Sequence, residues 1–141
     1  DKVTIAALTA TLQLYLDPDS LAARIPTIRM LSRSVEDIQA LAERVQNPLV
    51  AAVGDGFAVS IIDCQSQIGS GSLPVERLPS KALAIGTTKG KPGGKLQKLA
   101  DAFRALPMPV IGRIQDDAYL LDLRCLEDID GFTTQLGDLK L

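Results

Sequence analysis

The chain has 141 residues, with 46% hydrophobic and 23% charged residues, which is typical of a globular domain and excludes disordered and collagen-like classes. Its 15 lysines and arginines against 17 aspartates and glutamates give a net charge of −2, which argues against a strongly basic nucleic-acid-binding module. It has no histidine, so histidine-based catalytic triads and metal sites are excluded, and no apolar run approaches the length that spans a bilayer.

Residues 3–16 are predicted to form a helix that is apolar on nearly every face. Ile5, Leu8 and Leu12 follow helical spacing, while alanines and further leucines fill the remaining faces. Such a helix is stable when it is buried on several sides. We therefore expect a neighbouring domain to cover it, and because the chain opens with Asp1 rather than Met, we expect it to be a piece of something longer.

Two more helices are predicted before the first strand. Asp17, followed by proline, starts a short helix that ends near Pro26. Ser34 and Asp37 resemble a capping box and precede an amphipathic stripe. Pro48 is expected to kink that helix or to start a new turn.

The middle of the chain predicts two strands separated by loops. Residues 57–64 and 82–86 are the strand candidates, and a loop rich in glycine, serine and proline is expected over residues 65–80. A polar, flexible loop is expected over residues 87–94. A helix of three turns follows, with its apolar positions at Leu96, Leu99, Phe103 and Leu106.

The last third predicts a hairpin and a final helix. Residues 110–114 and 119–124 pair around an Asp-Asp turn, and Glu127 and Asp128 are expected in the first turn of the helix, where carboxylates suit the helix dipole. The resulting fold class is α+β, with about four mostly antiparallel strands and helices on one face.

Two glycine-containing loops are candidate anion sites. Residues 69–74 could offer backbone N–H groups, but a plain surface connection is the favoured interpretation. The loop with Lys89, Lys91 and Lys95 is not a Walker A motif, because Leu96 follows Gly94-Lys95. A mobile basic loop is favoured there, although three lysines could contact a nucleic-acid backbone.

Arg113 lies inside an apolar strand, where its charge requires a partner. That partner could be internal, such as Asp122 or Asp63, or a ligand carboxylate or phosphate, and the internal partner is slightly favoured. The thiols of Cys64 and Cys125 are expected to be reduced, buried and unreactive.

Lys2 is disfavoured as a Schiff-base lysine because it lies at a terminus without an enclosing pocket.

Several segments, in order along nearly the whole chain, resemble the C-terminal domain of the bacterial selenocysteine synthases, the L-seryl-tRNA(Sec) selenium transferases. The segments that carry the resemblance are DKVTIAAL and TLQLYL near the start, PTIRML, the run DCQSQIGSGSLPVERLPS from Asp63 to Ser80, LPMPVIGRI from Leu106 to Ile114, and LDLRCLED from Leu121 to Asp128. The main departure is the basic loop of residues 87–95.

The resemblance implies a fold-type I enzyme that uses pyridoxal 5'-phosphate. Its reaction converts seryl-tRNA(Sec) to selenocysteinyl-tRNA(Sec) with selenium from selenophosphate, in the cytoplasm and in a large homo-oligomer, expected to be a decamer. By this resemblance, residues 1–33 form an interdomain helix and connector, and residues 34–141 form the small C-terminal domain.

The same resemblance limits what this chain can do alone. The family's cofactor lysine stands in an Asp-Lys before a glycine-rich segment, whereas Asp1-Lys2 precedes Val-Thr-Ile. No catalytic, cofactor-binding or metal residue is therefore assigned, and the isolated chain is expected to be inactive and to self-associate through residues 3–16. Arg113, Ser70 and Ser72 are the candidate substrate-binding residues, with selenophosphate or the tRNA end as the anion.

Three other interpretations remain open. One is the small domain of another pyridoxal-phosphate lyase, which would lack the upstream tRNA-binding domain. Another is a free-standing binding or assembly module, which a Met directly before Asp1 would support. The third, a module that contacts tRNA by itself, fits poorly with the net charge of −2.

Overall fold

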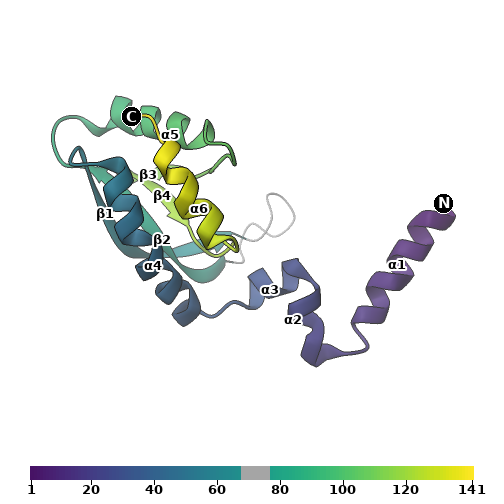
Figure 1. Cartoon of the computed structure of the whole chain (residues 1–141). Helices are drawn as coiled ribbons and strands as arrows, with labels where there is room; N and C mark the ends of the chain where they lie inside the picture. The colour runs from purple at the N-terminus through teal and green to yellow at the C-terminus, as the bar shows by residue number, and fades with distance from the viewer. Residues whose placement is uncertain (68–76) are drawn as a thin grey trace. The chain divides into compact units, whose positions relative to one another are not determined.

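The computed structural model of the chain describes residues 1–67 and 77–141 and divides into two compact units, Asp1–Arg33 and Ser34–Leu141 (Figure 1). The first unit consists of helices α1 (Lys2–Leu14), η1 (Pro18–Ser20), α2 (Leu21–Arg24) and α3 (Pro26–Ser32). The Asp1 carboxylate caps α1 by accepting a hydrogen bond from the Val3 backbone N–H at 3.2 Å.

The predicted first helix is confirmed, and its apolar side chains are exposed. No residue of α1 is buried, and Val3 and Ile5 expose 73% and 65% of their surface. Leu8 and Leu12, one turn apart along the same helix, are more than half exposed as well. The chain thus has the all-round apolar helix that its sequence predicts.

Pro26 begins a helix that the sequence analysis did not predict. The short helix expected from Asp17 to Pro26 is present as η1 and α2. The following residues form α3, with Pro26 in its first turn. A proline disrupts a helix that reaches it, but its fixed φ angle suits the first position of the next one. The Arg29 Nη1 atom donates to the Ala23 carbonyl at 3.1 Å and so joins α3 to α2.

In the second unit, α4 (Val35–Val53) begins as predicted and ends directly before the predicted turn at Gly54. Ser34 Oγ accepts a hydrogen bond from the Asp37 backbone N–H at 3.0 Å, which confirms the cap. Pro48 lies inside this helix and does not start a new turn, so of the two predicted alternatives only the kink stays a prediction. Apolar residues on both sides of the proline, including Val45 and Val53, are buried and keep this segment against the sheet.

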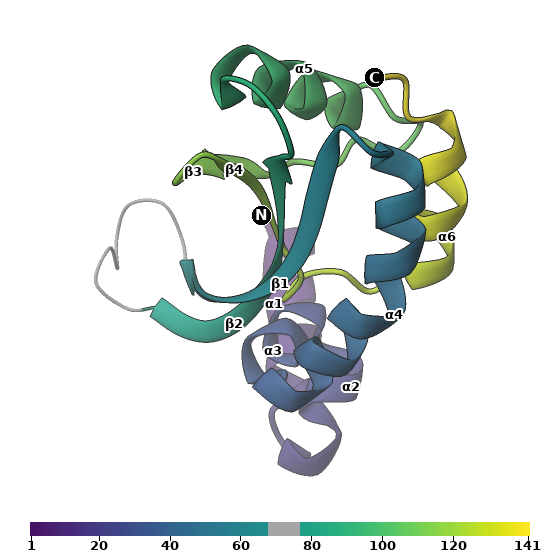
Figure 2. The same cartoon turned by 90° about the vertical axis from the view of Figure 1, so that its left-hand side faces the viewer.

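The sheet has four strands in the order β1-β2-β4-β3, and every pair is antiparallel, which confirms the predicted fold class (Figure 2). The strands are β1 (Phe57–Gln67), β2 (Arg77–Thr87), β3 (Arg113–Gln115) and β4 (Ala118–Asp122). The predicted hairpin is β3-β4, although both strands are shorter than expected. Its turn residues, Asp116 and Asp117, have φ angles of 50° and 57°, which suit a two-residue hairpin turn.

The loop predicted over residues 65–80 was wrong at both ends. Strand β1 extends to Gln67, and β2 begins at Arg77, so that Gln65 pairs with Pro79 in register. A proline is tolerated there because β4 pairs with β2 only from Ala82 onward, which leaves one side of β2 without a neighbouring strand at Pro79.

The last two α-helices, α5 and α6, also differ slightly from their predicted bounds. Helix α5 (Pro92–Arg104) starts inside the segment expected to be a loop, with Pro92 in its first turn. Helix α6 (Ile129–Gln135) is followed by η2 (Leu136–Asp138). Asp128 is the N-cap of α6 rather than part of its first turn, and its Oδ1 accepts from the Gly131 N–H at 2.8 Å.

The core of the second unit lies between one face of the sheet and helices α4, α5 and α6. Its strand members include Leu83, Ile85, Tyr119 and Leu121, which alternate along β2 and β4. Figure 2 shows these helices beside the strongly curved sheet. The intervening residues of the same strands, among them Ala82 and Asp122, point to the opposite face, which is called the polar face below.

Candidate functional site

Asp122, at the end of β4, is the centre of a hydrogen-bonded cluster on the polar face. Its Oδ2 accepts from Ser66 Oγ at 2.6 Å, and its Oδ1 accepts from Ser80 Oγ at 2.9 Å. The backbone N–H of Arg124 donates to the same Oδ1 at 3.1 Å. Both hydroxyl groups belong to buried serines, so this one carboxylate joins the ends of β1, β2 and β4.

Arg113 completes the cluster from the edge strand β3. Its Nη1 lies 4.0 Å from Asp122 Oδ2, and its Nε donates to Gln115 Oε1 at 3.3 Å. The arginine side chain remains 42% exposed. Of the two internal partners predicted for Arg113, Asp122 is confirmed, whereas Asp63 pairs with Lys81 at 2.6 Å instead.

Arg113 is positioned by a close contact between the backbone of Gly112 and the ring of Tyr119. The Gly112 N–H donates to the Tyr119 hydroxyl at 2.8 Å. A Cβ atom on Gly112 would lie 2.5 Å from the Leu120 carbonyl oxygen and 2.6 Å from the Tyr119 ring. Only glycine fits here without displacing the start of β3. Burial raises the pKa of the Tyr119 hydroxyl, while the hydrogen bond from Gly112 opposes that rise in part.

The Cys64 thiol lies beside this cluster. Burial raises its pKa, and the negative charge of Asp122 raises it further, while Arg113 and Ser80 oppose the change only in part. Cys64 is thus a poor nucleophile, as predicted. The expectation that both thiols are buried was wrong, because Cys64 is only partly buried and Cys125 is exposed.

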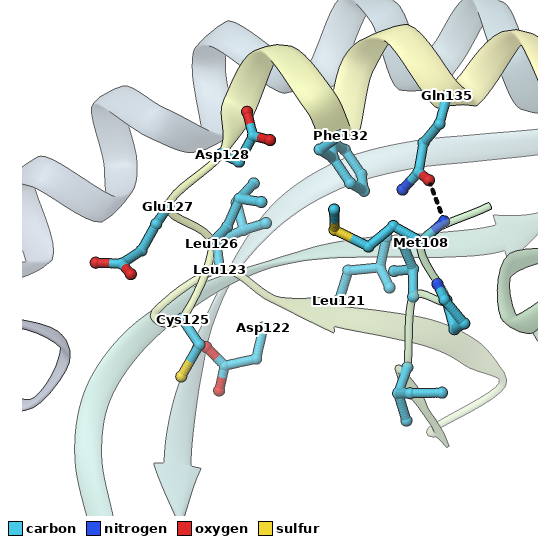
Figure 3. Close-up of a pocket in the computed structure, with 13 residues that line it drawn as sticks. Met108, Leu121, Asp122, Leu123, Cys125, Leu126, Glu127, Asp128, Phe132 and Gln135 are labelled. Carbon is cyan, nitrogen blue, oxygen red and sulfur yellow. Dashed lines mark hydrogen bonds between the residues drawn. The ribbon is translucent and has the colours of Figure 1, made fainter. Parts of the chain in front are cut away.

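A cavity of about 460 Å³ lies between β4, α6 and the segment before β3 (Figure 3). Phe132, on α6, points toward the Met108 side chain (Figure 3), and the Met108 backbone N–H donates to Gln135 Oε1 at 2.9 Å. Its ionisable lining residues, apart from the Cys125 thiol, are the carboxylic acids Asp122, Glu127 and Asp128.

The cavity beside α6 does not fit pyridoxal phosphate. The cofactor carries a phosphate and needs a lysine amine in an enclosed site. The cavity beside α6 is lined by carboxylates and apolar side chains, with no lysine or arginine among its lining residues. Over residues 1–67 and 77–141, no group of three or more metal-ligating side chains comes together, and no helix is long and apolar enough to cross a membrane.

Of the three substrate-binding residues predicted from the sequence, only one lies in the part of the chain that the structure describes. Arg113 is described above, whereas Ser70 and Ser72 lie outside the described residues. Sequence reasoning missed Ser66, Ser80 and the central place of Asp122. The missing signal was strand register: Cys64 pairs with Ser80, and Ala82 pairs with Asp122, which brings these residues to neighbouring rows of one face.

The described residues of the second unit form a small α+β domain whose polar face carries the Asp122 cluster and the half-exposed Arg113. A family model described as L-seryl-tRNA selenium transferase matches residues 1–127. The chain belongs to this family.

Curated relatives agree with the family model. The chain is 56% identical over 136 residues to the L-seryl-tRNA(Sec) selenium transferases of Shigella flexneri serotype 5b and of a second Shigella flexneri strain. It is 55% identical over the same length to that of an Escherichia coli strain. Each match covers 96% of this chain and 29% of the relative, so the chain spans less than a third of the length of these relatives.

Proposed function

We propose that this chain is the C-terminal portion of a pyridoxal-phosphate-dependent selenium transferase, which converts L-seryl-tRNA(Sec) to L-selenocysteinyl-tRNA(Sec) with selenophosphate. The observation that carries the proposal is the 56% identity over 96% of the chain to transferases of that name. The compact α+β unit of residues 34–141 supports it, since it has a core of its own.

In this proposal the cofactor binds to the remainder of the enzyme, and the isolated chain is inactive. When bound, the cofactor supplies the electron sink for replacing the seryl hydroxyl group by selenium. The carboxylate-lined cavity beside α6 supports its placement elsewhere, because a phosphate would be repelled there.

Helix α1 is proposed to pack against that remainder of the enzyme, in a cytoplasmic homo-oligomer that is a decamer by resemblance. Its exposed apolar side chains support this packing, because covering them removes apolar surface from water. In the isolated chain, the same surface is expected to cause self-association.

Arg113 is proposed to bind an anion of the reaction, selenophosphate or the tRNA end. Its half-exposed guanidinium group can donate to an oxyanion. Asp122, 4.0 Å away, holds the guanidinium group over the polar face.

The test for Arg113 is steady-state kinetics of the full-length enzyme that contains this chain. Arg113→Ala is expected to raise the KM for selenophosphate about tenfold or more, since a charge-assisted hydrogen bond contributes roughly 1.5–3 kcal/mol. Arg113→Lys should recover part of the loss. Arg104→Ala, which removes an exposed arginine paired with Asp101 on α5, is the matched control. Unchanged kinetics of Arg113→Ala would remove this role.

The test for the missing cofactor site uses the isolated chain. After incubation with one equivalent of pyridoxal phosphate and borohydride reduction, mass spectrometry should show no stoichiometric adduct. The full-length enzyme should carry one cofactor per subunit, on a lysine outside this chain. A stoichiometric adduct on a single lysine of the isolated chain would contradict the proposal.

A further inference from the structure

The strongest concentration of positive charge in the second unit lies at the start of α5. Lys89, Lys91, Lys95 and Lys98 are all exposed, and they are called the lysine patch below. No aspartate or glutamate occurs in the sequence between Glu76 and Asp101. The chain as a whole carries a net charge of −2, so this patch stands out from an otherwise acidic protein.

The structure brings the four lysines onto one end of α5. The Lys95 ammonium group donates to the Lys89 carbonyl at 2.9 Å, which folds the preceding loop back over the helix. Lys95 and Lys98 are three residues apart and therefore adjacent on the helix surface. Within the described part of the chain, none of the four ammonium groups forms an ion pair with an aspartate or glutamate side chain.

This end of α5 is unfavourable for the isolated domain. The N-cap residue of α5 is Lys91, whose side chain makes no capping hydrogen bond, as is also the case at the starts of α2 and α3. Lysines near a helix N-terminus are repelled by the helix dipole. A bound polyanion would relieve both the mutual repulsion of the lysines and this unfavourable placement.

An apolar surface lies directly beside the patch. Lys95 and Lys98 line a pocket of about 230 Å³ together with Phe57 and Leu141. Phe57 is partly buried and packs against the core, so the patch offers ammonium groups to phosphates and no stacking platform for bases.

We propose that the lysine patch binds the phosphodiester backbone of an RNA, so that this domain contacts the tRNA substrate at a place separate from Arg113. The inference rests on the proposed function for the identity of the RNA. Lysines provide charge without base readout, so the patch contributes affinity and salt dependence rather than sequence specificity.

The test measures binding of an unacylated selenocysteine tRNA transcript to the full-length enzyme by fluorescence anisotropy at several potassium chloride concentrations. In the test variant all four lysines of the patch are changed to Gln. The matched control removes four other exposed charges by changing Arg24, Arg44, Arg77 and Arg104 to Gln. Thermal unfolding of each variant confirms that it is folded.

The patch variant should bind the tRNA about tenfold more weakly near physiological salt, and the slope of log affinity against log salt should fall by about 2–3, as expected when several phosphate contacts are lost. The control variant should stay near the wild type. Equal weakening of both variants, or no weakening of either, would overturn the inference. Patch-dependent binding to phosphatidylserine vesicles without a change in tRNA binding would overturn it as well.

The binding assay separates this inference from the proposed function. A wild-type enzyme that binds the tRNA through the patch but transfers no selenium would contradict the proposed function and support the inference. If the wild-type enzyme and the patch variant transfer selenium equally well and bind the tRNA equally well, the inference is contradicted and the proposed function is supported.

Discussion

The two units of the chain place similar apolar residues in opposite surroundings. In Ser34–Leu141, the stripe on α4 is buried against the sheet, and its other face is polar. In Asp1–Arg33 no residue is buried, although α1 is rich in Ala, Leu, Ile and Val. An amphipathic helix needs one apolar surface to cover it, and α4 finds that surface in its own unit. Helix α1 needs several such surfaces, and the proposed function places them on the remainder of the enzyme.

The largest predicted effect is the difference between equivalent truncations in the two units. Leu83→Ala, in the centre of β2, should lower the free energy of unfolding of this chain by about 2–5 kcal/mol, because it leaves a cavity in the core. Leu8→Ala in α1 should change it by less than about 0.5 kcal/mol, as for an exposed site. Urea unfolding of both variants measures the difference, and a similar loss in both would show that α1 belongs to the same core.

The sequence predicts the second unit well where its patterns are local. The Ser34 cap, the Asp-Asp hairpin turn and the spacing of Leu96, Leu99 and Phe103 each predict an element that the structure contains. Prediction from the sequence fails where the pairing of strands outweighs the local amino-acid composition. Residues 65–67 and 77–80 look like loop because they are polar or contain Pro79, yet β1 and β2 hold them in register.

The second prediction compares two aspartates of one sheet. Asp122→Ala should lower the free energy of unfolding by about 2–4 kcal/mol, because Ser66 and Ser80 would lose the acceptor of their buried hydroxyl groups. Asp63→Ala should cost less than about 1 kcal/mol, since its side chain is 88% exposed and its ion pair with Lys81 is at the surface. Equal losses in chemical denaturation would mean that Asp122 does not organise the polar face.

The third prediction concerns the two glycines that lie closest to the hairpin. Gly112→Ala should lower the free energy of unfolding by about 1–3 kcal/mol, because the added methyl group meets the Leu120 carbonyl and the Tyr119 ring. Gly86→Ala on β2 meets no atom within 4 Å and serves as the control. Gly112→Ala should also raise the KM for selenophosphate in the full-length enzyme if β3 positions Arg113. A variant as stable as Gly86→Ala would contradict the close packing.

The cluster around Asp122 shows why the site was harder to predict than the fold. Arg113 is visible in the sequence because a charge inside an apolar strand is costly, and the same argument names Asp122 as a possible partner. The two serines give no such signal. Their contribution depends on which face of β1 and β2 they occupy, and that depends on a register set by contacts far apart in the sequence.

The smallest predicted effect is a difference in thiol chemistry. Cys125 is exposed, whereas burial raises the pKa of Cys64, so iodoacetamide at pH 8 should alkylate Cys125 first. A raised thiol pKa means that the unfolded chain ionises before the folded one as pH increases. Stability should therefore fall as pH rises above the ordinary thiol pKa, and Cys64→Ser should reduce that fall. Mass spectrometry measures the alkylation of each thiol. Equal rates for Cys64 and Cys125 would contradict the predicted difference in their reactivity.

Hydrogen exchange of α1, followed by mass spectrometry, tests the central claim most directly. In the isolated chain, at concentrations where it is monomeric, the amides of Lys2–Leu14 should exchange rapidly while the core of Ser34–Leu141 remains protected. In the full-length enzyme the same helix should become protected, because the remainder of the enzyme covers it. Strong protection of α1 in the isolated monomer, or no gain in the full-length enzyme, would contradict the account.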